Sequence, residues 1–152
     1  MVAASLPFPG SGAMPLEISV TATPADADVA VIDQNLTTFN EAEVGPQQRM
    51  LLTVLVRDGN GAVAAGINGM TSWGWLYVQR LWVGESLRGQ GVAARMLAAA
   101  EAEALKRGCH SAYIDTFNPV ALKTYQRHGF VEYGRLKDFV AGRDRIFLQK
   151  KL

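Results

Sequence analysis

Three β-rich runs follow one another between residues 50 and 83 with only tight turns between them. The runs are Met50–Arg57, Ala62–Met70 and Trp75–Val83. Asp58–Gly61 joins the first two runs and Thr71–Gly74 joins the last two, and both connections contain residues that tolerate positive φ. Strands joined by such short turns pair antiparallel and need no crossover helix. We therefore expect an antiparallel meander at the centre of the fold.

The pattern changes after this meander. Gly84–Gly91 is a glycine-containing loop, and Val92–Arg107 is rich in alanine with apolar residues at helical spacing. Ser111–Phe117 follows as another strand, so that strand, helix and strand form one unit with parallel strands. A parallel pair inside a mostly antiparallel sheet predicts the α+β class.

Both ends of the chain add further elements. Glu17–Ala22 alternates as a short first strand, and Thr23–Asp26 has the composition of a helix start. Apolar residues at positions 29, 32, 36 and 39 extend that helix, and the polar stretch 40–49 predicts a loop. Asn118–Arg127 predicts a short helix, and the segments 130–139 and 145–151 predict two closing strands joined through Ala141 and Gly142. The expected order is β-α-β-β-β-α-β-α-β-β.

Composition limits the classes of protein. A chain of 152 residues with 49% hydrophobic residues suits one folded domain, which we expect over residues 15–152, after a flexible extension over residues 1–14. Fifteen Lys and Arg against 14 Asp and Glu argue against a protein that coats nucleic acid or a membrane surface. Cys109 is the only cysteine, residues 1–13 hold no Lys or Arg, and His110 and His128 lack ligand spacing. We expect a cytoplasmic protein without a metal.

The loop from Arg88 to Ala93 is the most informative segment. It leads from a strand into a helix, where unpaired N–H groups and glycines can hold a phosphate. A simple chain reversal is an equally good interpretation of the loop alone. Gly89-x-Gly91-x-x-Ala94, followed by Asp115, also matches a dinucleotide fingerprint and allows a Rossmann-type oxidoreductase. The three preceding hairpin strands argue against that alternative.

Two segments together resemble a known family. Arg88-x-x-Gly91-x-Ala93 is similar to the (Gln/Arg)-x-x-Gly-x-(Gly/Ala) signature of the GNAT superfamily of acyl-CoA-dependent N-acyltransferases. The run from Asn118 through Tyr125 into Gly-Phe resembles the second signature of that family, and the resemblance covers about residues 15–152. It implies the GNAT fold and transfer of an acetyl group from acetyl-CoA to an amine. A GNAT-fold module that binds CoA without efficient catalysis is the alternative.

The resemblance also implies which residues bind the cofactor. The loop would hold the pyrophosphate of CoA, the strand before it would pair with the pantetheine arm, and Asn118 would contact the cofactor near the gap where the two parallel strands separate. The implied loop and strand residues are Leu81, Trp82, Val83, Arg88, Gly89, Gln90, Gly91, Val92 and Ala93. Five basic residues are open as partners of the 3′-phosphate: Arg127, Arg135, Lys137, Arg143 and Arg145.

Tyr125 would be the general acid that protonates the departing thiolate. A base is needed as well, because an alkylamine with a pKa near 10.4 must lose a proton before it attacks. Many family members place a Glu on the strand before the signature loop, but this strand has no acid, and its Gln79 could only position a water or the substrate. Glu41, Glu43 and Asp115 are the remaining base candidates.

The acceptor is expected to be a small-molecule or peptide amine, and cationic amines are among the candidates. In the family, the loop after the first helix and the first hairpin turns line the acceptor cleft, which here offers Phe39, Glu41, Glu43, Trp73 and Trp75. Charge is divided unevenly, because residues 1–49 hold six acids and only Arg49, whereas the other 14 basic residues follow. This division suggests a cationic or neutral acceptor, and exposed edge strands allow a homodimer.

Overall fold

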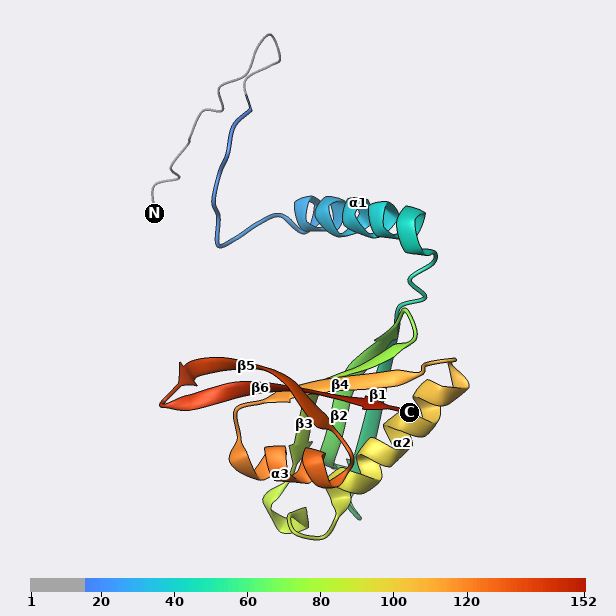
Figure 1. The fold of residues 1–152 in the computed structure, drawn as a ribbon, viewed down its shortest axis with the longest axis vertical. Coiled ribbons are helices and arrows are strands. Elements are labelled where there is room, and N and C mark those ends of the chain that lie inside the picture. Colours follow the sequence, from blue (N-terminus) through green and yellow to red (C-terminus); the bar gives the residue numbers. More distant parts are fainter. Residues whose placement is uncertain (1–15) are drawn as a thin grey trace. The chain divides into compact units, whose positions relative to one another are not determined.

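The computed structural model describes residues 16–152, and the chain separates into two compact units over residues 1–45 and 46–152 (Figure 1). Each unit is described by itself below. The flexible extension predicted for residues 1–14 lies outside the described residues.

The described part of the first unit contains one helix, α1, over Asp26–Val44. Two predictions here are wrong. Residues 17–22 form no strand, because no neighbouring strand in the described chain offers them hydrogen bonds, and Val20 is 80% exposed. The predicted loop over residues 40–49 begins later, because polar residues are compatible with a helix and the chain meets no breaker until Gly45, whose φ is +88°.

The second unit is built on a six-stranded sheet. Its elements in chain order are β1 (Met50–Arg57), β2 (Val63–Ser72), β3 (Trp75–Val83), the short helix η1 (Glu85–Leu87), α2 (Val92–Lys106), β4 (Ser111–Thr116), α3 (Pro119–Arg127), β5 (Val131–Val140) and β6 (Arg143–Lys151). The strand order is β1-β2-β3-β4-β6-β5, and only β3 and β4 are parallel. This sheet confirms the predicted α+β class and excludes the Rossmann-type alternative, which needs a mainly parallel sheet.

Two-residue turns close two of the hairpins. Trp73 and Gly74, between β2 and β3, have φ of +45° and +77°, and Ala141 and Gly142, between β5 and β6, have φ of +49° and +70°. Positive φ at both central residues matches the twist of the flanking strands. The turn predicted at residues 141–142 is therefore confirmed.

The core lies between one face of the sheet and the helices α2 and α3. Along β3, Leu76 and Val78 are buried in this core with Met96 and Leu97 of α2, while Tyr77 points to the opposite face. In the first unit, no residue of α1 is buried. The sheet thus has a helix-covered face and a second face on which the side chains of alternate residues project.

A β-bulge interrupts β3 near its middle. Asn68 of β2 pairs with Arg80, whereas the next residue, Gly69, pairs with Val78, so Gln79 is an extra residue in the ladder. Gly69 is required at this position, since a Cβ there would collide with the carbonyl oxygen of Tyr77. The bulge changes which residues face the core, because Leu76 and Val78 do so before it, and the odd-numbered Leu81 and Val83 pack there after it.

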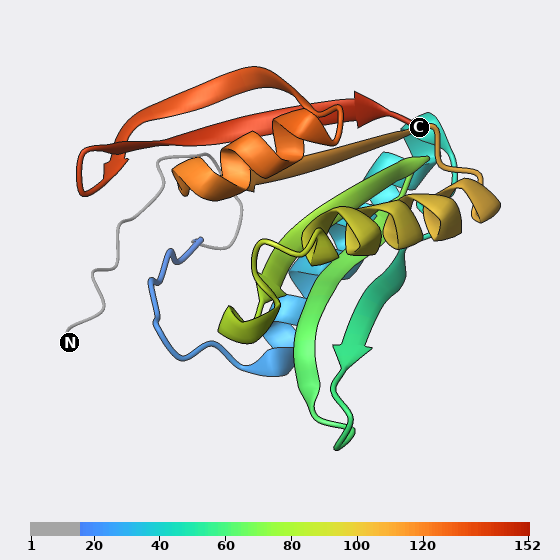
Figure 2. The same cartoon turned by 90° about the horizontal axis from the view of Figure 1, so that it is seen from below.

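The parallel pairing of β3 with β4 ends at the same place. It runs from Trp75 opposite Ser111 to Val78 opposite Ile114 and continues no further. Beyond that point the two strands diverge, as Figure 2 shows for the green β3 and the brown β4. The backbone of β3 from Gln79 onward therefore has one edge that no described strand pairs with. This is the gap that the family resemblance implied.

Candidate active site

A cavity of about 730 Å³ lies where β3 and β4 diverge, on the helix-covered face of the sheet. Its walls come from the end of β3, the loop before α2, the start of α2 and one side of α3. Of the ten implied cofactor residues, nine line it: Leu81, Trp82, Val83, Arg88, Gly89, Gly91, Val92, Ala93 and Asn118. Gln90 does not, because its side-chain amide turns back and donates to the carbonyl oxygen of Ser86 at 2.7 Å.

The N-terminus of α2 opens into this cavity. Gly91 is the N-cap residue in a left-handed conformation with φ of +73°, and no side chain caps the helix. The first N–H groups of α2 therefore lack side-chain partners, and the partial positive charge of the helix end adds to their pull on an anion. Arg88 adds a full positive charge, held by its Nε donating to the carbonyl oxygen of Val83 at 3.2 Å. A phosphate group fits this arrangement.

One side of α3 forms the opposite wall. Asn118 caps this helix, since its Oδ1 accepts from the backbone N–H of Val120 at 2.8 Å and of Ala121 at 3.3 Å. Val120, Thr124 and His128 line the cavity and were not predicted. Their spacing of four residues places them on one helix face, and this periodicity could have identified them.

Tyr125 also lies on α3 and lines the cavity, with only 5% of its surface exposed. Its ring packs edge-to-face against Phe130 at 6.4 Å between centroids. Burial raises the pKa of its phenol to about 12, with a smaller contribution from the negative charge of Asp115. The hydroxyl therefore keeps its proton at neutral pH and can act as a hydrogen-bond donor.

The three base candidates lie in different surroundings. Asp115 is on β4, one residue beyond the last parallel pair, and its Oδ1 accepts from the hydroxyl of Tyr77 at 3.4 Å. Its Oδ2 forms an ion pair with Arg145, at 2.7 Å from Nε and 2.6 Å from Nη2. Glu41 and Glu43 are in the last turns of α1 and not in a loop, which corrects the predicted position of both residues.

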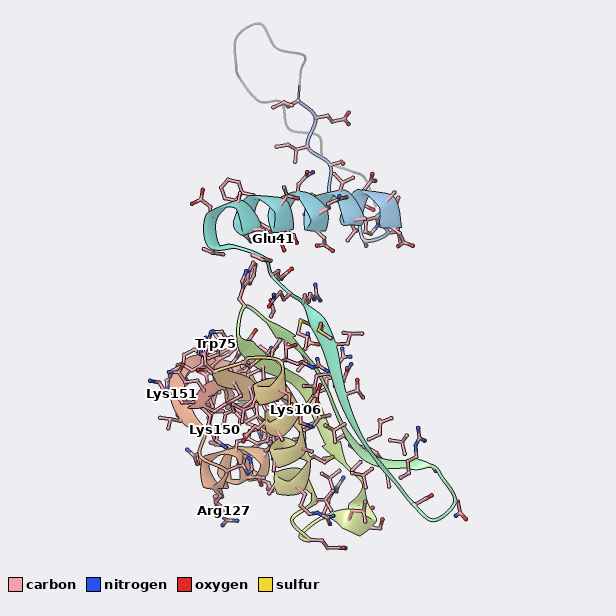
Figure 3. The ribbon with its side chains drawn as sticks, turned by 90° about the vertical axis from the view of Figure 1, so that its right-hand side faces the viewer. Glu41, Trp75, Lys106, Arg127, Lys150 and Lys151 are labelled. Carbon is pink, nitrogen blue, oxygen red and sulfur yellow. The ribbon has the colours of Figure 1, made fainter. Side chains whose placement is uncertain are left out.

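A second cavity, of about 670 Å³, lies on the other face of the sheet. It is lined by side chains that alternate with those of the core: Trp75, Tyr77 and Gln79 of β3, Tyr113 of β4, Tyr133 of β5 and Gln149 of β6, with Gln47, Arg49, Met70, Ser72 and Trp73 around them. Trp73 and Trp75, which we expected near the acceptor, are thus both at this cavity, and Figure 3 marks Trp75. Phe39 is on α1 in the first unit, where it is 67% exposed.

The five basic residues considered for the 3′-phosphate have different partners. Arg127 lines the first cavity and projects from the end of α3 in Figure 3. Arg135 pairs with Glu132 and Asp144, Lys137 pairs with Asp144, and Arg145 pairs with Asp115. Of these five residues, only Arg127 lines the first cavity.

Each histidine lies close to a polar side chain. Nδ1 of His110 lies 2.9 Å from the hydroxyl of Ser111, and Nε2 of His128 lies 3.2 Å from a carboxylate oxygen of Glu101. Within residues 16–152, no cluster of three or more His, Cys, Asp or Glu could hold a metal ion. In the same range, no helix is long and apolar enough to cross a membrane.

Comparison with known proteins gives a consistent result. Residues 21–130 match the Acetyltransferase (GNAT) family. The chain is 45% identical to an acetyltransferase of Agrobacterium fabrum over 127 residues, which cover 84% of this chain and 92% of that protein. It is 36% identical to the blasticidin-S acetyltransferase of Streptomyces morookaense over 93 residues, covering 60% of this chain and 68% of that protein.

Solved structures agree with these sequence matches. The fold is similar to the crystal structure of an acetyltransferase from Agrobacterium tumefaciens, with a TM-score of 0.80 and 43% identity over 88% of this chain and 98% of that one. A second similar structure, an acetyltransferase from Bacillus cereus, gives a TM-score of 0.77 and 25% identity over 88% of this chain and 97% of that one.

Proposed function

The chain belongs to the acetyltransferase (GNAT) family and is an acyltransferase, and we propose that it transfers an acetyl group from acetyl-CoA to a small-molecule primary amine by direct attack in a ternary complex. The amine nitrogen attacks the thioester carbonyl carbon, a C–N bond forms, and the C–S bond breaks. The departing thiolate takes a proton, and the amine loses one. The proposed transfer has no acyl-cysteine intermediate, because the lone thiol, Cys109, is buried in the core.

The first cavity supports binding of acetyl-CoA. The N–H groups at the start of α2 and the side chain of Arg88 would hold the pyrophosphate, with Arg127 as the proposed partner of the 3′-phosphate. The unpaired edge of β3 over Leu81, Trp82 and Val83 would hydrogen-bond to the amide groups of the pantetheine arm. Asn118, at the opposite wall, would contact the cofactor through the amide nitrogen that its capping role leaves available.

Tyr125 is the proposed general acid. The raised pKa keeps a proton on the phenol until the thiolate develops, and the position on the cavity wall suits a donor to the sulfur. A bound thioester would meet this hydroxyl near the gap between β3 and β4.

Asp115 is the proposed base, with Glu41 and Glu43 as alternatives on α1. Asp115 lies beside the divergence of β3 from β4, on the side of the sheet where the second cavity lies. Gln79, at the bulge, would position the amine or an intervening water. Replacing each acid in turn by its amide, and following kcat against pH, separates them. Only the variant that removes the base loses the ionisation that activates the amine.

One observation supports the proposal above all others. A single cavity is lined by an uncapped helix N-terminus, an unpaired strand edge and Tyr125, three features that suit a phosphate, an amide-containing arm and a leaving thiolate. Thermal unfolding with acetyl-CoA, CoA and NAD(H) tests it, because a ligand that binds only the native state raises Tm. At 100 times the Kd the stabilisation is about 2.7 kcal/mol. No shift with either CoA compound would refute the binding site.

Catalysis is tested separately by turnover of acetyl-CoA with a panel of amines. Binding of CoA without turnover on any amine would favour a binding module over an enzyme. Two accompanying expectations are a cytoplasmic location, which suits a protein with one buried free thiol, and a homodimer formed through an edge strand, β1 or β5. Size-exclusion chromatography with light scattering measures the oligomeric state.

A further inference from the structure

A row of side chains crosses the sheet at the floor of the second cavity. Met70, Tyr77, Tyr113 and Gln149 are direct partners on the four adjacent strands β2, β3, β4 and β6. The rings of Tyr77 and Tyr113 are stacked, with centroids 4.4 Å apart and planes within 5°. Trp75 meets Tyr113 edge-on at 6.0 Å. Because the two tyrosine rings cover each other's facing sides, the floor offers their edges and outer faces in fixed orientations.

The same cavity is poor in charge. Among the described residues that line it, Arg49 is the only charged one, and none is a carboxylate. Asp115, whose Oδ1 accepts from the hydroxyl of Tyr77, forms an ion pair with Arg145 and does not line the cavity. A second positive charge on the acceptor would find no partner here and would be repelled by Arg49.

The length of the cavity limits the acceptor as well. Gln79, at the bulge, marks the end nearest the gap, and Trp75 lies four residues away along β3. At about 3.3 Å per residue, the backbone positions of these two residues are roughly 13 Å apart along the strand. A molecule whose amine reaches the gap therefore extends its remaining part over the two tyrosines toward the tryptophan.

We infer that the acceptor is a monoamine on a flat aromatic body, which packs against Tyr77, Tyr113 and Trp75 while its amine points to the gap at Gln79. This inference rests on the proposed function, because it assigns the acceptor side of the same reaction. Aromatic contacts with edge-to-face or offset geometry contribute about 0.5–1.5 kcal/mol beyond the buried area. A flat ring therefore binds better here than a saturated ring of the same size.

Calorimetric titration of the full chain saturated with CoA tests the preference without turnover. The probes are 2-phenylethylamine, 2-cyclohexylethylamine, which keeps the amine and the apolar bulk but loses the flat ring, and spermidine, which adds positive charge. We expect 2-phenylethylamine to bind about three to ten times more tightly than its cyclohexyl counterpart. Equal binding of the two ring amines, or tighter binding of spermidine, would overturn the inference.

Variants locate the effect. Tyr113→Leu removes a ring from the floor and should reduce the affinity for 2-phenylethylamine three- to tenfold, with less than a twofold change for the cyclohexyl amine. Tyr113→Phe keeps the ring and should retain the preference. Phe117→Leu is the matched control, since Phe117 is 48% exposed and lines neither cavity. If Tyr113→Leu still preferred 2-phenylethylamine over the cyclohexyl amine, the aromatic ring of the acceptor would not pack against Tyr113, and the inferred position would be wrong.

The two proposals fail in different ways. Absence of a thermal shift with CoA counts against the proposed function, and titration of the same amines without CoA then still measures the second cavity. A thermal shift with CoA, together with acetylation of spermidine in preference to the aromatic amine, leaves the acetyltransferase in place and rejects the aromatic acceptor.

Discussion

At the scale of single residues, the protonation of Tyr125 defines what this side chain can do. Its pKa of about 12 exceeds that of a thiol, near 8.5, by about 3.5 units, so proton transfer to a free thiolate is uphill by about 5 kcal/mol. A kcat of about 10 s⁻¹ corresponds to a barrier of about 16 kcal/mol. The free energy of this proton transfer is therefore smaller than the barrier to turnover. The phenol would stabilise the developing thiolate by a hydrogen bond before the proton moves.

Replacing Tyr125 by Phe should lower kcat by about 100-fold, because general acid catalysis typically contributes a factor of 10² or more. The KM for acetyl-CoA should change little, since the ring and its contact with Phe130 are retained. Steady-state kinetics with a good acceptor measures both constants. Wild-type turnover in this variant would show that another group protonates the thiolate.

The same residue predicts a loss of stability at high pH. The unfolded phenol ionises near pH 10 and the folded one near pH 12, so above pH 10 the unfolded state binds fewer protons and is favoured. The free energy of unfolding should fall by about 2 kcal/mol by pH 12 from this group alone. Urea unfolding at pH 9 and pH 11.5 measures the fall, which should be smaller in Tyr125→Phe. An identical fall in the free energy of unfolding of both proteins would contradict the raised pKa of the buried Tyr125 phenol.

At the scale of elements, the bulge in β3 depends on a glycine in the neighbouring strand. Gly69→Ala would push a methyl group into the carbonyl oxygen of Tyr77, so we expect a loss of about 2–3 kcal/mol of unfolding free energy. Gly59→Ala is the matched control, because Gly59 has ordinary φ and no atom within 4 Å of a Cβ. Urea unfolding compares the two variants. Equal stability would mean that the bulge tolerates a side chain.

The loop before α2 allows a second matched pair of variants. Gly91 and Gly142 have φ of +73° and +70°, and neither has an atom within 4 Å of a Cβ. Alanine at either position should cost about 1–2 kcal/mol of stability through backbone strain. Only Gly91→Ala should also weaken acetyl-CoA binding, by about tenfold, because only Gly91 lines the first cavity. Equal affinities in a CoA titration would argue against the loop as the pyrophosphate site.

The sequence was sufficient for elements that local chemistry determines. Both β1 and β3 have the predicted bounds, because turn residues on each side fix where these strands end. The bulge at Gln79 was not predicted, since it is a property of the register between two strands. The segment at residues 17–22 alternates like a strand, but pairing depends on a neighbour that a single segment does not reveal.

The site was predictable to a similar degree. The signature loop and Tyr125 follow from motifs, and both line one cavity. The row formed by Tyr77, Tyr113 and Gln149 was not predicted, because its members come from three strands that are far apart in sequence. Each of these residues by itself is compatible with an ordinary sheet surface.

At the scale of the whole molecule, charge separates with the two units. Residues 1–45 contain six acidic residues and no Lys or Arg, whereas residues 46–152 contain 15 basic and 8 acidic residues. The second unit, which contains both cavities, therefore has a net charge of +7. Its field favours approach of an anionic cofactor over approach of a polycation.

This distribution predicts a salt dependence that differs between the two substrates. Raising NaCl from 20 to 500 mM should increase the KM for acetyl-CoA several-fold, because ions screen the attraction of the cofactor to the basic unit. The KM for a monoamine should not rise. Initial rates at several salt concentrations test both statements. If both KM values rose in parallel, salt would be acting on the whole protein and not on the attraction of acetyl-CoA to the basic unit.

Charge reversal of Glu41 and Glu43 tests whether α1 affects the acceptor. If these acids attract cationic amines, the double variant should raise the KM for spermidine but not for acetyl-CoA. An unchanged KM for spermidine would leave the acidic first unit without a role in acceptor binding.

The extra residue at Gln79 has a consequence for inhibition. Side chains of β3 line a cavity on each face of the sheet, so we expect a compound in one cavity to leave the other accessible. An aromatic amine analogue should then be a noncompetitive inhibitor against acetyl-CoA. A single molecule built to occupy both cavities would need a narrow linker at its waist, where β3 and β4 begin to part.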